Sequence, residues 1–483
     1  MPKMCNGMVH HCKTPPTHDA PVRGSRRWSK PKLEVADVFR RYGDAYRRTH
    51  GWRLSAAQRR VLRELAACRT AAMGGHVNRC GHCGHGKQAY NSCRNRLCGK
   101  CRGKDRVDWY QQQARLMLPV EYLHAVFTVP DEIARLTRRN PELLYNLLFH
   151  AASRALLRTG RELLDVELGL VLVLHSWGQL LNHHPHVHVL LPAGGISTAD
   201  GRWIALPSGE TLPKQVLRER FQKTFLKRVK RLYRAGRLAL DGELAGLKDP
   251  EAFSKWHEAL AARRWVVYID PATAYGDPRD PDHGEQIVRY MARYASGMVL
   301  SNYRLISIDD GEVKFFYKDY RDGARRKVKT LPADEFIDRF LAHVLPRGMR
   351  HKRYHGFMAP KGRRKRLQQI RRMLGAPELD AVEDEAVDEG EERDSSANLA
   401  VDEEATKGYP CPVCGVGRMV RGATMPRPTI WQILTMPFPD EKVIDECRRR
   451  IASLPEEPSW TAWPRSPVSC PEYRQRLLPL VFT

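Results

Sequence analysis

The chain contains no long run of apolar residues, no apolar segment near its start, and few acidic residues for its number of basic ones. No stretch of about 18 or more apolar residues is present, so we expect no membrane span. Residues Met1 to Gly24 contain no apolar h-region, so no signal peptide for export is expected. These absences favour a cytoplasmic protein that makes no membrane contact.

The shortage of acidic residues leaves a large positive charge. Lysine and arginine total 81 against 55 aspartate and glutamate residues, and the formal net charge is +26. Such an excess predicts a polyanionic partner, of which nucleic acid is the first candidate. With 483 residues the chain is long enough for several domains with cores of their own. Its hydrophobic fraction of 42% is slightly low for a compact globule, which fits polar linkers between them.

The twelve cysteines are spaced in a way that indicates metal binding and not disulfides. They gather in CxxC pairs in a large chain without an export signal, a pattern typical of zinc sites in a reducing compartment. Two pairs follow one another closely, and four thiolates close a tetrahedral structural site. The predicted ligands of this structural Zn²⁺ are Cys80, Cys83, Cys98 and Cys101, with Cys93 as an alternative and His82 and His85 as weaker substitutes.

A later CxxC pair, Cys411 and Cys414, resembles half of a zinc ribbon. The remaining candidates to complete it, Cys447 and Cys470, are too loosely placed to form a second pair. Spacing alone therefore leaves this half without a partner.

Alternating histidines mark a candidate catalytic metal site in the stretch from His184 to His188. The surrounding run, Pro185 to Leu191, is predicted to be a strand, so His186 and His188 point to one face and Val187 points into the core. Paired imidazoles on a rigid strand suit a divalent cation, Mg²⁺ or Mn²⁺, and nitrogen ligands favour Mn²⁺.

A predicted helix about a hundred residues later carries two candidate nucleophiles, Tyr290 and Tyr294. Gln286 precedes them at helical spacing, so all three lie along one face. Gln286 is the favoured third metal ligand, and His184, on the histidine face of the strand, is the alternative. We expect Tyr290 to be nearer the metal and to cut first. Tyr303 lies beyond the helix and is not chosen. Histidines on a strand with tyrosines on a helix suggest metal-assisted attack of a tyrosine on a phosphodiester.

The hydrophobic patterns predict a mixed fold of helices and antiparallel strands. Strands are expected at 123–129, 168–175, 185–191 and 265–269, and helices at 35–48, from Ser55 onward, and at 141–157. Two further strands, 303–308 and 313–317, are expected to form a hairpin. Several antiparallel strands with helices on one side indicate an α+β palm.

Basic and acidic residues are strongly segregated toward the end of the chain. Residues 347–372 are dense in arginine and lysine with interleaved aromatic residues, a composition suited to phosphates and unpaired bases. Residues 378–404 then reverse the charge, because acidic side chains are frequent there and Arg393 is the only basic one. This composition predicts a disordered linker. The predicted DNA-binding residues are Arg94, Arg96, Arg289, Arg293, Arg363, Arg364, Lys365 and Arg366.

In combination these motifs resemble the rolling-circle transposases of the insertion sequence 91 family, which belong to the HUH nuclease superfamily. The resemblance covers about residues 32 to 420. It rests on the segments Asn91 to Cys98, His184 to His188, Arg289 to Tyr294, Leu300 to Arg304, and Cys411 to Gly415.

The resemblance implies a bacterial, nucleoid-associated enzyme that nicks and rejoins single-stranded DNA at element ends through a 5′-phosphotyrosine intermediate. It also implies an antiparallel, palm-like HUH nuclease sheet with flanking helices, preceded by a helical and zinc-binding module. Two alternatives are an HUH replication initiator nuclease and a zinc-dependent DNA-binding protein without catalysis. The expected organisation is a disordered tail (1–28), a helical region (29–75), a zinc-binding module (76–105), the HUH catalytic domain (118–320), a basic DNA-binding region (321–373), an acidic linker (374–407), and a partial zinc ribbon with a C-terminal tail (408–483).

Overall fold

The computed structural model describes residues 31–206, 212–270, 283–295, 297–379 and 408–426. The predicted tail at 1–28, most of the predicted linker at 374–407, and Cys447 and Cys470 lie outside these residues. The chain divides into two compact units. The first unit comprises residues 99–392 together with 1–34, and the second comprises residues 35–98 together with 393–483.

A five-stranded antiparallel sheet forms the centre of the first unit, with strand order β13-β5-β6-β3-β9. The predicted strands are confirmed to within a few residues. The edge strand β13 lies inside the stretch that we had interpreted only as a basic region. The strands are β3 (Tyr122–Thr128), β5 (Gly169–Trp177), β6 (His183–Pro192), β9 (Val266–Asp270) and β13 (Lys352–Gly356).

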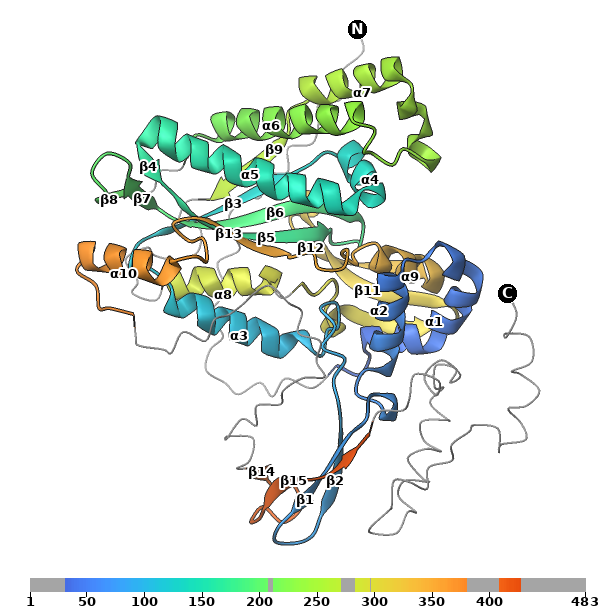
Figure 1. The fold of residues 1–483 in the computed structure, drawn as a ribbon. Helices are drawn as coiled ribbons and strands as arrows, with labels where there is room; N and C mark the ends of the chain where they lie inside the picture. The colour runs from blue at the N-terminus through green and yellow to red at the C-terminus, as the bar shows by residue number, and fades with distance from the viewer. Residues whose placement is uncertain (1–30, 207–211, 271–282, 296, 380–407, 427–483) are drawn as a thin grey trace. The chain divides into compact units, whose positions relative to one another are not determined.

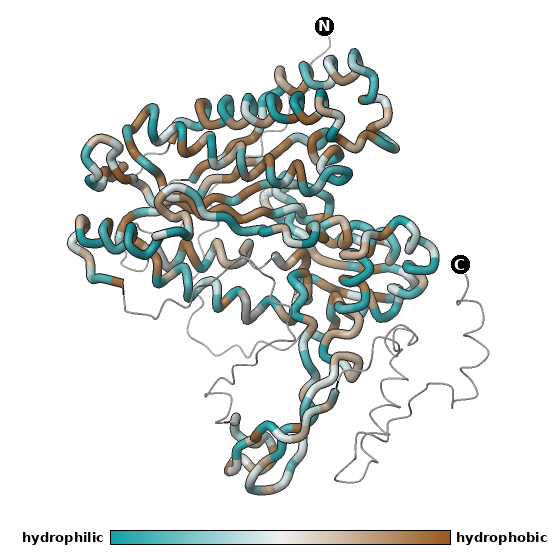
Figure 2. The backbone as a smooth tube through the Cα atoms, in the orientation of Figure 1, coloured by the Kyte–Doolittle hydropathy of each residue, from teal (hydrophilic) through white to brown (hydrophobic). Residues whose placement is uncertain are grey.

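Helices cover both faces of this sheet, whereas the sequence led us to expect helices on one side only (Figure 1). Leucine, valine and phenylalanine side chains alternate between the faces, so each face has its own apolar cluster. The tube coloured by hydropathy is accordingly brown along the sheet strands (Figure 2). One face carries α4 (Asp131–Arg139), α5 (Pro141–Leu164), α6 (Lys214–Arg234) and α7 (Pro250–Ala262); the other carries α3 (Arg102–Arg115), α8 (His283–Ala295) and α10 (Arg363–Met373).

Two smaller sheets complete the described part of the first unit. The predicted hairpin at 303–317 is confirmed, and its turn uses positive φ angles at Asp310 (53°) and Gly311 (77°), which right-twisted strands favour. A third strand extends it. The sheet that contains the hairpin consists of β10 (Leu305–Asp309), β11 (Glu312–Asp319) and β12 (Arg325–Pro332), and α9 (Ala333–Leu341) follows it. The other sheet consists of β4 (Val166–Glu167), β7 (Gly194–Ser197) and β8 (Trp203–Ala205).

The second unit joins a helix pair to a small sheet. The helices are α1 (Val35–His50) and α2 (Ala56–Ala67), and α2 begins, as expected, directly after Ser55. A capping box starts this helix, in which the side chains of Ser55 and Gln58 accept hydrogen bonds from each other's backbone N–H groups. The sheet has strand order β14-β15-β1-β2. Its strands are β1 (Gly75–Cys80), β2 (Gly86–Tyr90), β14 (Tyr409–Pro410) and β15 (Arg418–Met425), so residues that are far apart in the sequence share one sheet.

Within the described parts of the chain, no helix combines the length and the apolar character that crossing a membrane requires.

Candidate functional site

Three histidines from two neighbouring strands converge on the α8 side of the central sheet. His186 and His188 lie on one face of β6, as predicted, and Val187 is buried in the opposite core. The register pairs His186 with His175 on β5, so the third imidazole enters from the adjacent strand. Ligand nitrogens of His175, His186 and His188, the histidine group, all lie within 4.8 Å of one another.

The donor atoms of the histidine group fit a divalent cation. His186 donates its Nδ1–H to the His184 carbonyl oxygen at 2.7 Å, which leaves its Nε2 lone pair facing His175 Nδ1 at 3.1 Å. His188 Nε2 is buried and has no hydrogen-bond partner. Burial lowers the pKa of His186 to about 3 and holds the pKa values of His175 and His188 well below 6.5. All three rings are therefore neutral at physiological pH, which metal ligation requires.

The third member of this group differs from both sequence candidates. His184 is not part of the group, because the ligand atoms that converge come from His175, His186 and His188. Gln286 lies on α8 with an exposed side chain. The alternation of side chains along β5 could have indicated His175, because Val171, Val173 and His175 share one face of that strand. The pairing of β5 with β6 then places His175 beside His186.

The two tyrosines of α8 stand directly over the histidine group. Their hydroxyl oxygens are 2.7 Å apart. The Tyr294 ring stacks on His188 with centroids 4.0 Å apart, and it also meets the edge of His175 at 5.5 Å. Tyr290 instead contacts His124, at 5.6 Å. Our expectation that Tyr290 would be nearer the metal ligands is therefore wrong, because it relied on Gln286 as the reference point.

Behind the histidine group lies a second layer that sequence reasoning missed. His124 on β3 places Nε2 2.9 Å from His188 Nδ1. On its other side, His124 Nδ1 is 3.9 Å from a carboxylate oxygen of Asp270 on β9. Partners of this kind fix the tautomer and ring orientation of a ligating histidine. For His188 they favour a protonated Nδ1, which leaves Nε2 as the lone pair directed into the site.

The cysteines form two groups, neither of which is the predicted one. Cys80 and Cys83 do not share a site with Cys98 and Cys101, because they lie at the turn of the hairpin formed by β1 and β2. The predicted alternative Cys93 is instead a full member of one group, and Cys68 was missed. Within each group all ligand atoms lie within 4.8 Å of one another, the two groups being Cys68, Cys93, Cys98 and Cys101, and Cys80, Cys83, Cys411 and Cys414.

Both groups are suited to structural zinc. None of these eight cysteines is engaged in a disulfide. In the first group, Cys98 Sγ and Cys68 Sγ are 3.6 Å apart. In the second, backbone N–H groups of Gly417 and Val416 lower the pKa of Cys414 to about 6, so this thiol is largely ionised at neutral pH. Tetrahedral sets of four thiolates are the usual ligands of structural Zn²⁺.

The predicted DNA-binding residues fall into different environments. Arg94 and Lys365 are exposed, and Arg289 is exposed with its guanidinium 5.6 Å from the Tyr110 ring centroid. Arg366 is used internally, since its Nε donates to the Phe357 carbonyl oxygen at 3.0 Å. Arg363 lies 5.0 Å from the Tyr354 ring centroid, Arg96 and Arg364 are half-buried, and the side chain of Arg293 lies outside the described residues.

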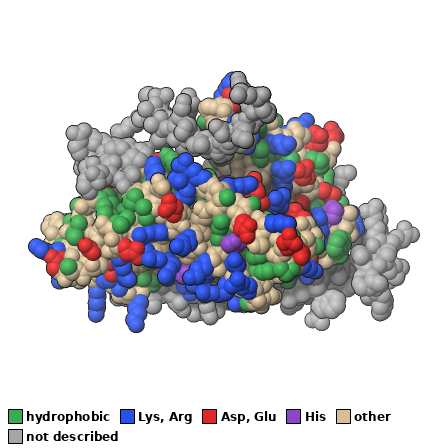
Figure 3. Space-filling model, turned by 90° about the horizontal axis from the view of Figure 1, so that it is seen from above, with side chains coloured by type: hydrophobic (Ala, Val, Ile, Leu, Met, Phe, Trp, Pro, Cys, Tyr) green, Lys and Arg blue, Asp and Glu red, His purple; other side chains and the backbone are tan. Residues whose placement is uncertain are grey.

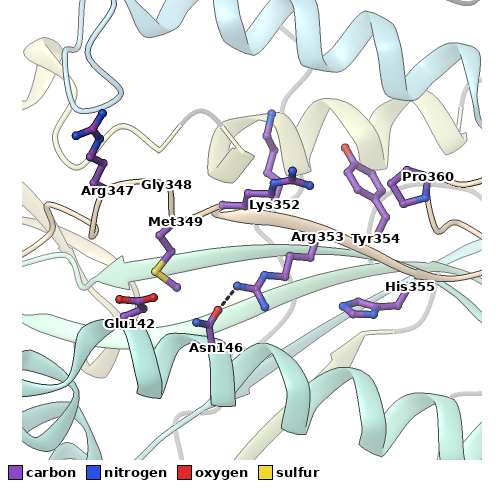
Figure 4. Close-up of a pocket in the computed structure, with 11 residues that line it drawn as sticks. Glu142, Asn146, Arg347, Gly348, Met349, Lys352, Arg353, Tyr354, His355 and Pro360 are labelled. Atoms are coloured by element: carbon purple, nitrogen blue, oxygen red, sulfur yellow. Dashed lines mark hydrogen bonds between the residues drawn. The ribbon is translucent and has the colours of Figure 1, made fainter. Parts of the chain in front are cut away.

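A basic cavity of about 420 Å³ opens between β13 and α5 (Figure 4). Arg353 points toward Asn146 and donates to its amide oxygen, and its guanidinium lies 4.3 Å from the Phe149 ring centroid, so this cation is held in place. The remaining cations of the lining are Arg347, Arg350 and Lys352, against one carboxylate, Glu142. Such a balance favours phosphate groups.

A second basic surface lies on α6. Its apolar stripe, Leu217, Phe221, Phe225 and Val229, is buried, and its opposite face is largely exposed lysine and arginine. Figure 3, which looks down on the side of α6 and α7, shows lysine and arginine side chains in a broad group on this face.

Most of the chain is similar in sequence to known transposases. Residues 38–129 match the family model described as "Transposase zinc-binding domain", and residues 169–366 match the one described as "Putative transposase". The chain is 41% identical over 389 residues to "Putative transposase y4qJ" of Sinorhizobium fredii, covering 80% of this chain and 94% of that protein.

A second relative is more distant. The "Transposase for insertion sequence element IS801" of Pseudomonas savastanoi pv. phaseolicola is 29% identical over 306 residues, which is 62% of this chain and 70% of that protein. No solved structure matches the chain.

Proposed function

Because the chain belongs to the insertion sequence 91 family of transposases, as its motifs led us to expect, we propose that it cuts and rejoins single-stranded DNA by tyrosine attack. The observation that carries the proposal is the stacking of Tyr294 on His188, with the Tyr290 hydroxyl 2.7 Å from that of Tyr294. Two candidate nucleophiles thus share one buried metal-ligand set. The proposed reaction is rolling-circle transposition on an HUH-type sheet.

The histidine group is the proposed holder of the catalytic cation, with His175 replacing Gln286 and His184 as third ligand. A divalent cation bound there supplies Lewis-acid polarisation of the scissile phosphate. Three neutral imidazoles without a carboxylate suit Mn²⁺ better than Mg²⁺, which prefers oxygen ligands. His124 and Asp270 position His188 for this task.

Tyr294 is the proposed first nucleophile. Attack joins its phenolic oxygen to phosphorus and breaks the bond to the 3′ oxygen, which leaves as a hydroxyl group with the proton that Tyr294 gives up. Burial, together with the neighbouring Tyr294, raises the pKa of Tyr290 far above 10, so Tyr290 retains its proton. Its O–H group is therefore placed to donate to the Tyr294 oxygen and to stabilise the negative charge that develops there.

The phosphotyrosine bond conserves the energy of the broken phosphodiester, so a second DNA end is joined without ATP. Tyr290, one helical turn away, is the proposed nucleophile for that second transfer. The basic cavity at β13, the exposed face of α6 and the exposed residues Arg94, Arg289 and Lys365 are proposed to hold the DNA backbone. Their phosphate contacts supply affinity and little sequence information.

The proposal is tested by incubating the full chain with labelled single-stranded DNA from an element end and Mn²⁺, and then trapping covalent adducts. We expect a 5′ adduct on Tyr294 in the wild-type chain. Replacing the hydroxyl alone, in Tyr294→Phe, abolishes the first adduct at unchanged DNA binding. Tyr290→Phe still forms the first adduct, more slowly because the donor to the Tyr294 oxygen is gone, and loses strand joining. Tyr303→Phe, at a position that is 53% exposed and beyond α8, is the matched control and reacts as wild type.

The metal ligands are tested in the same assay. His188→Ala removes a lone pair that no other group in the site replaces, so cleavage is lost while DNA binding by the basic surfaces persists. Tyrosine adducts formed by the Tyr290→Phe, Tyr294→Phe double variant, or normal nicking by His188→Ala, would falsify the mechanism.

A further inference from the structure

The second cysteine group joins two segments of the chain that lie more than three hundred positions apart. Cys80 and Cys83 sit at the end of the hairpin formed by β1 and β2, and Cys411 and Cys414 sit between β14 and β15. The matching zinc-binding family model ends at residue 129, so it contains only the first pair. The sheet order places β15 directly beside β1, with Cys80 opposite Met419.

The two halves are built alike. Each is a CxxC pair followed by a glycine, Gly84 or Gly415, whose positive φ (70° and 66°) lets the chain turn back behind the second cysteine. In each half a backbone N–H is directed at a sulfur, from His82 to Cys80 and from Gly417 to Cys414, both at 3.4 Å. The shared glycine turn supports pairing the C-terminal half with the first CxxC pair.

The distances between the halves match one tetrahedral ion. Cys80 Sγ lies 3.7 Å from Cys414 Sγ, and Cys83 Sγ lies 3.7 Å from Cys411 Sγ. Four sulfurs placed about 2.3 Å from a zinc ion at the corners of a tetrahedron are about 3.8 Å apart. The approach is close enough that a Cβ on Gly417 would lie 2.5 Å from Cys80 Sγ, so the position requires glycine.

Apart from the backbone pairing of β1 with β15, few apolar contacts hold the two segments together. The apolar cluster of this sheet consists of Cys80, Cys411 and Met419, with Cys414 against it, so the ligands themselves are most of the core. The side chains of Arg79, Lys87, Arg418 and Arg421 are exposed, and neither segment, 75–90 or 408–426, contains an acidic residue. Without a metal, this basic sheet has almost no buried surface to close it.

We propose that the chain binds two structural zinc ions, and that the second, held by Cys80, Cys83, Cys411 and Cys414, fastens the segment at 408–426 onto the N-terminal hairpin. The zinc-binding part of the protein is therefore incomplete without residues that follow the catalytic unit. Zinc occupancy at this site determines whether the basic residues of β1, β2 and β15 form one surface.

The test measures zinc per chain in the full-length protein by elemental analysis. The variant Cys411→Ser, Cys414→Ser loses one zinc relative to wild type. The variant Cys68→Ser, Cys93→Ser also loses one, from the other group. The matched control Cys447→Ser, Cys470→Ser removes two cysteines outside both groups and loses none. An unchanged zinc content in the Cys411→Ser, Cys414→Ser variant overturns the proposal.

Alkylation followed by mass spectrometry tests the pairing itself, without requiring the variant sheet to fold. In the zinc-loaded wild type, Cys411 and Cys414 are protected from alkylation. In the variant Cys80→Ser, Cys83→Ser both become reactive, while Cys68, Cys93, Cys98 and Cys101 stay protected. Continued protection of Cys411 and Cys414 in that variant would show that they bind metal with other ligands, and the joint site would be wrong.

Discussion

The central sheet of the first unit and the small sheet of the second unit are both antiparallel, yet different forces hold them. The central sheet buries aromatic and aliphatic side chains on both faces, with Phe127, Phe149 and Phe221 fully buried. The small sheet has two cysteines and one methionine as its buried cluster. The first is thus stabilised by removing apolar surface from water, and we propose that the second depends on metal ligation.

The same difference suggests different roles for the histidine ligands and the cysteine ligands. The histidines add a site to a sheet that is already stable, so a cation there can exchange without loss of the fold. The cysteines replace a core. The proposed catalytic metal therefore fits the central sheet, and the proposed structural zinc fits the small one.

Removing metal is expected to have the largest effect, and on one sheet only. A strong zinc chelator should unfold β1, β2 and β15, because structural zinc contributes about 10–16 kcal/mol in comparable small modules. Hydrogen exchange should show lost protection in these strands and unchanged protection in β3, β5 and β6. Equal loss of protection in both sheets would contradict the distinction.

Truncating a buried apolar side chain should destabilise the central sheet and not the small one, and the loss of stability should be smaller than that caused by removing zinc. Phe127 is fully buried and meets the edge of Phe221 at a centroid distance of 5.2 Å, so Phe127→Ala should destabilise the central sheet by about 3–5 kcal/mol. The control Val420→Ala, on β15 and 44% exposed, should change stability by about 0.5 kcal/mol or less. Denaturant unfolding followed by hydrogen exchange in each sheet measures both. A large effect of Val420→Ala would mean that the small sheet has an apolar core after all.

The two regions also differ in how far the sequence could predict them. Periodicity within one strand or helix correctly grouped His186 with His188 and Tyr290 with Tyr294, because such spacing depends only on local geometry. His175 required the register of a neighbouring strand, which alternation alone does not specify. The zinc ligands were misassigned because nearness in sequence was used to pair the CxxC motifs. The glycine that follows Cys83 and Cys414, but not Cys101, was the local feature that could have paired them correctly.

Acidification should produce the smallest loss of stability. It should destabilise the central sheet by protonating buried histidines that are not part of the histidine group. His343 is 1% exposed, and its Nδ1 lies 3.2 Å from Ser176 Oγ and its Nε2 3.2 Å from the Leu181 carbonyl oxygen. Burial, with nearby His183 adding to it, lowers the pKa of His343 to about 3. The folded state therefore excludes a proton that the unfolded chain binds below pH 6.5. The stabilisation is complete above pH 6.5 and is lost as the pH falls from there toward 3.

Lowering the pH from 7.5 to 5.5 should cost about 1.4 kcal/mol for such a group, since one pH unit below the unfolded pKa corresponds to roughly that free energy. His343→Gln retains an amide that can donate to Leu181 and cannot titrate, so the loss on acidification should shrink by about that amount. The measurement is the unfolding free energy of the zinc-saturated protein at both pH values, followed through β5 and β6. An identical pH dependence in wild type and variant would mean that His343 takes up its proton without unfolding, and that burial does not hold it neutral. A reduced dependence would show that the central sheet responds to protons through its own packed interior, whereas the small sheet responds through its thiolates.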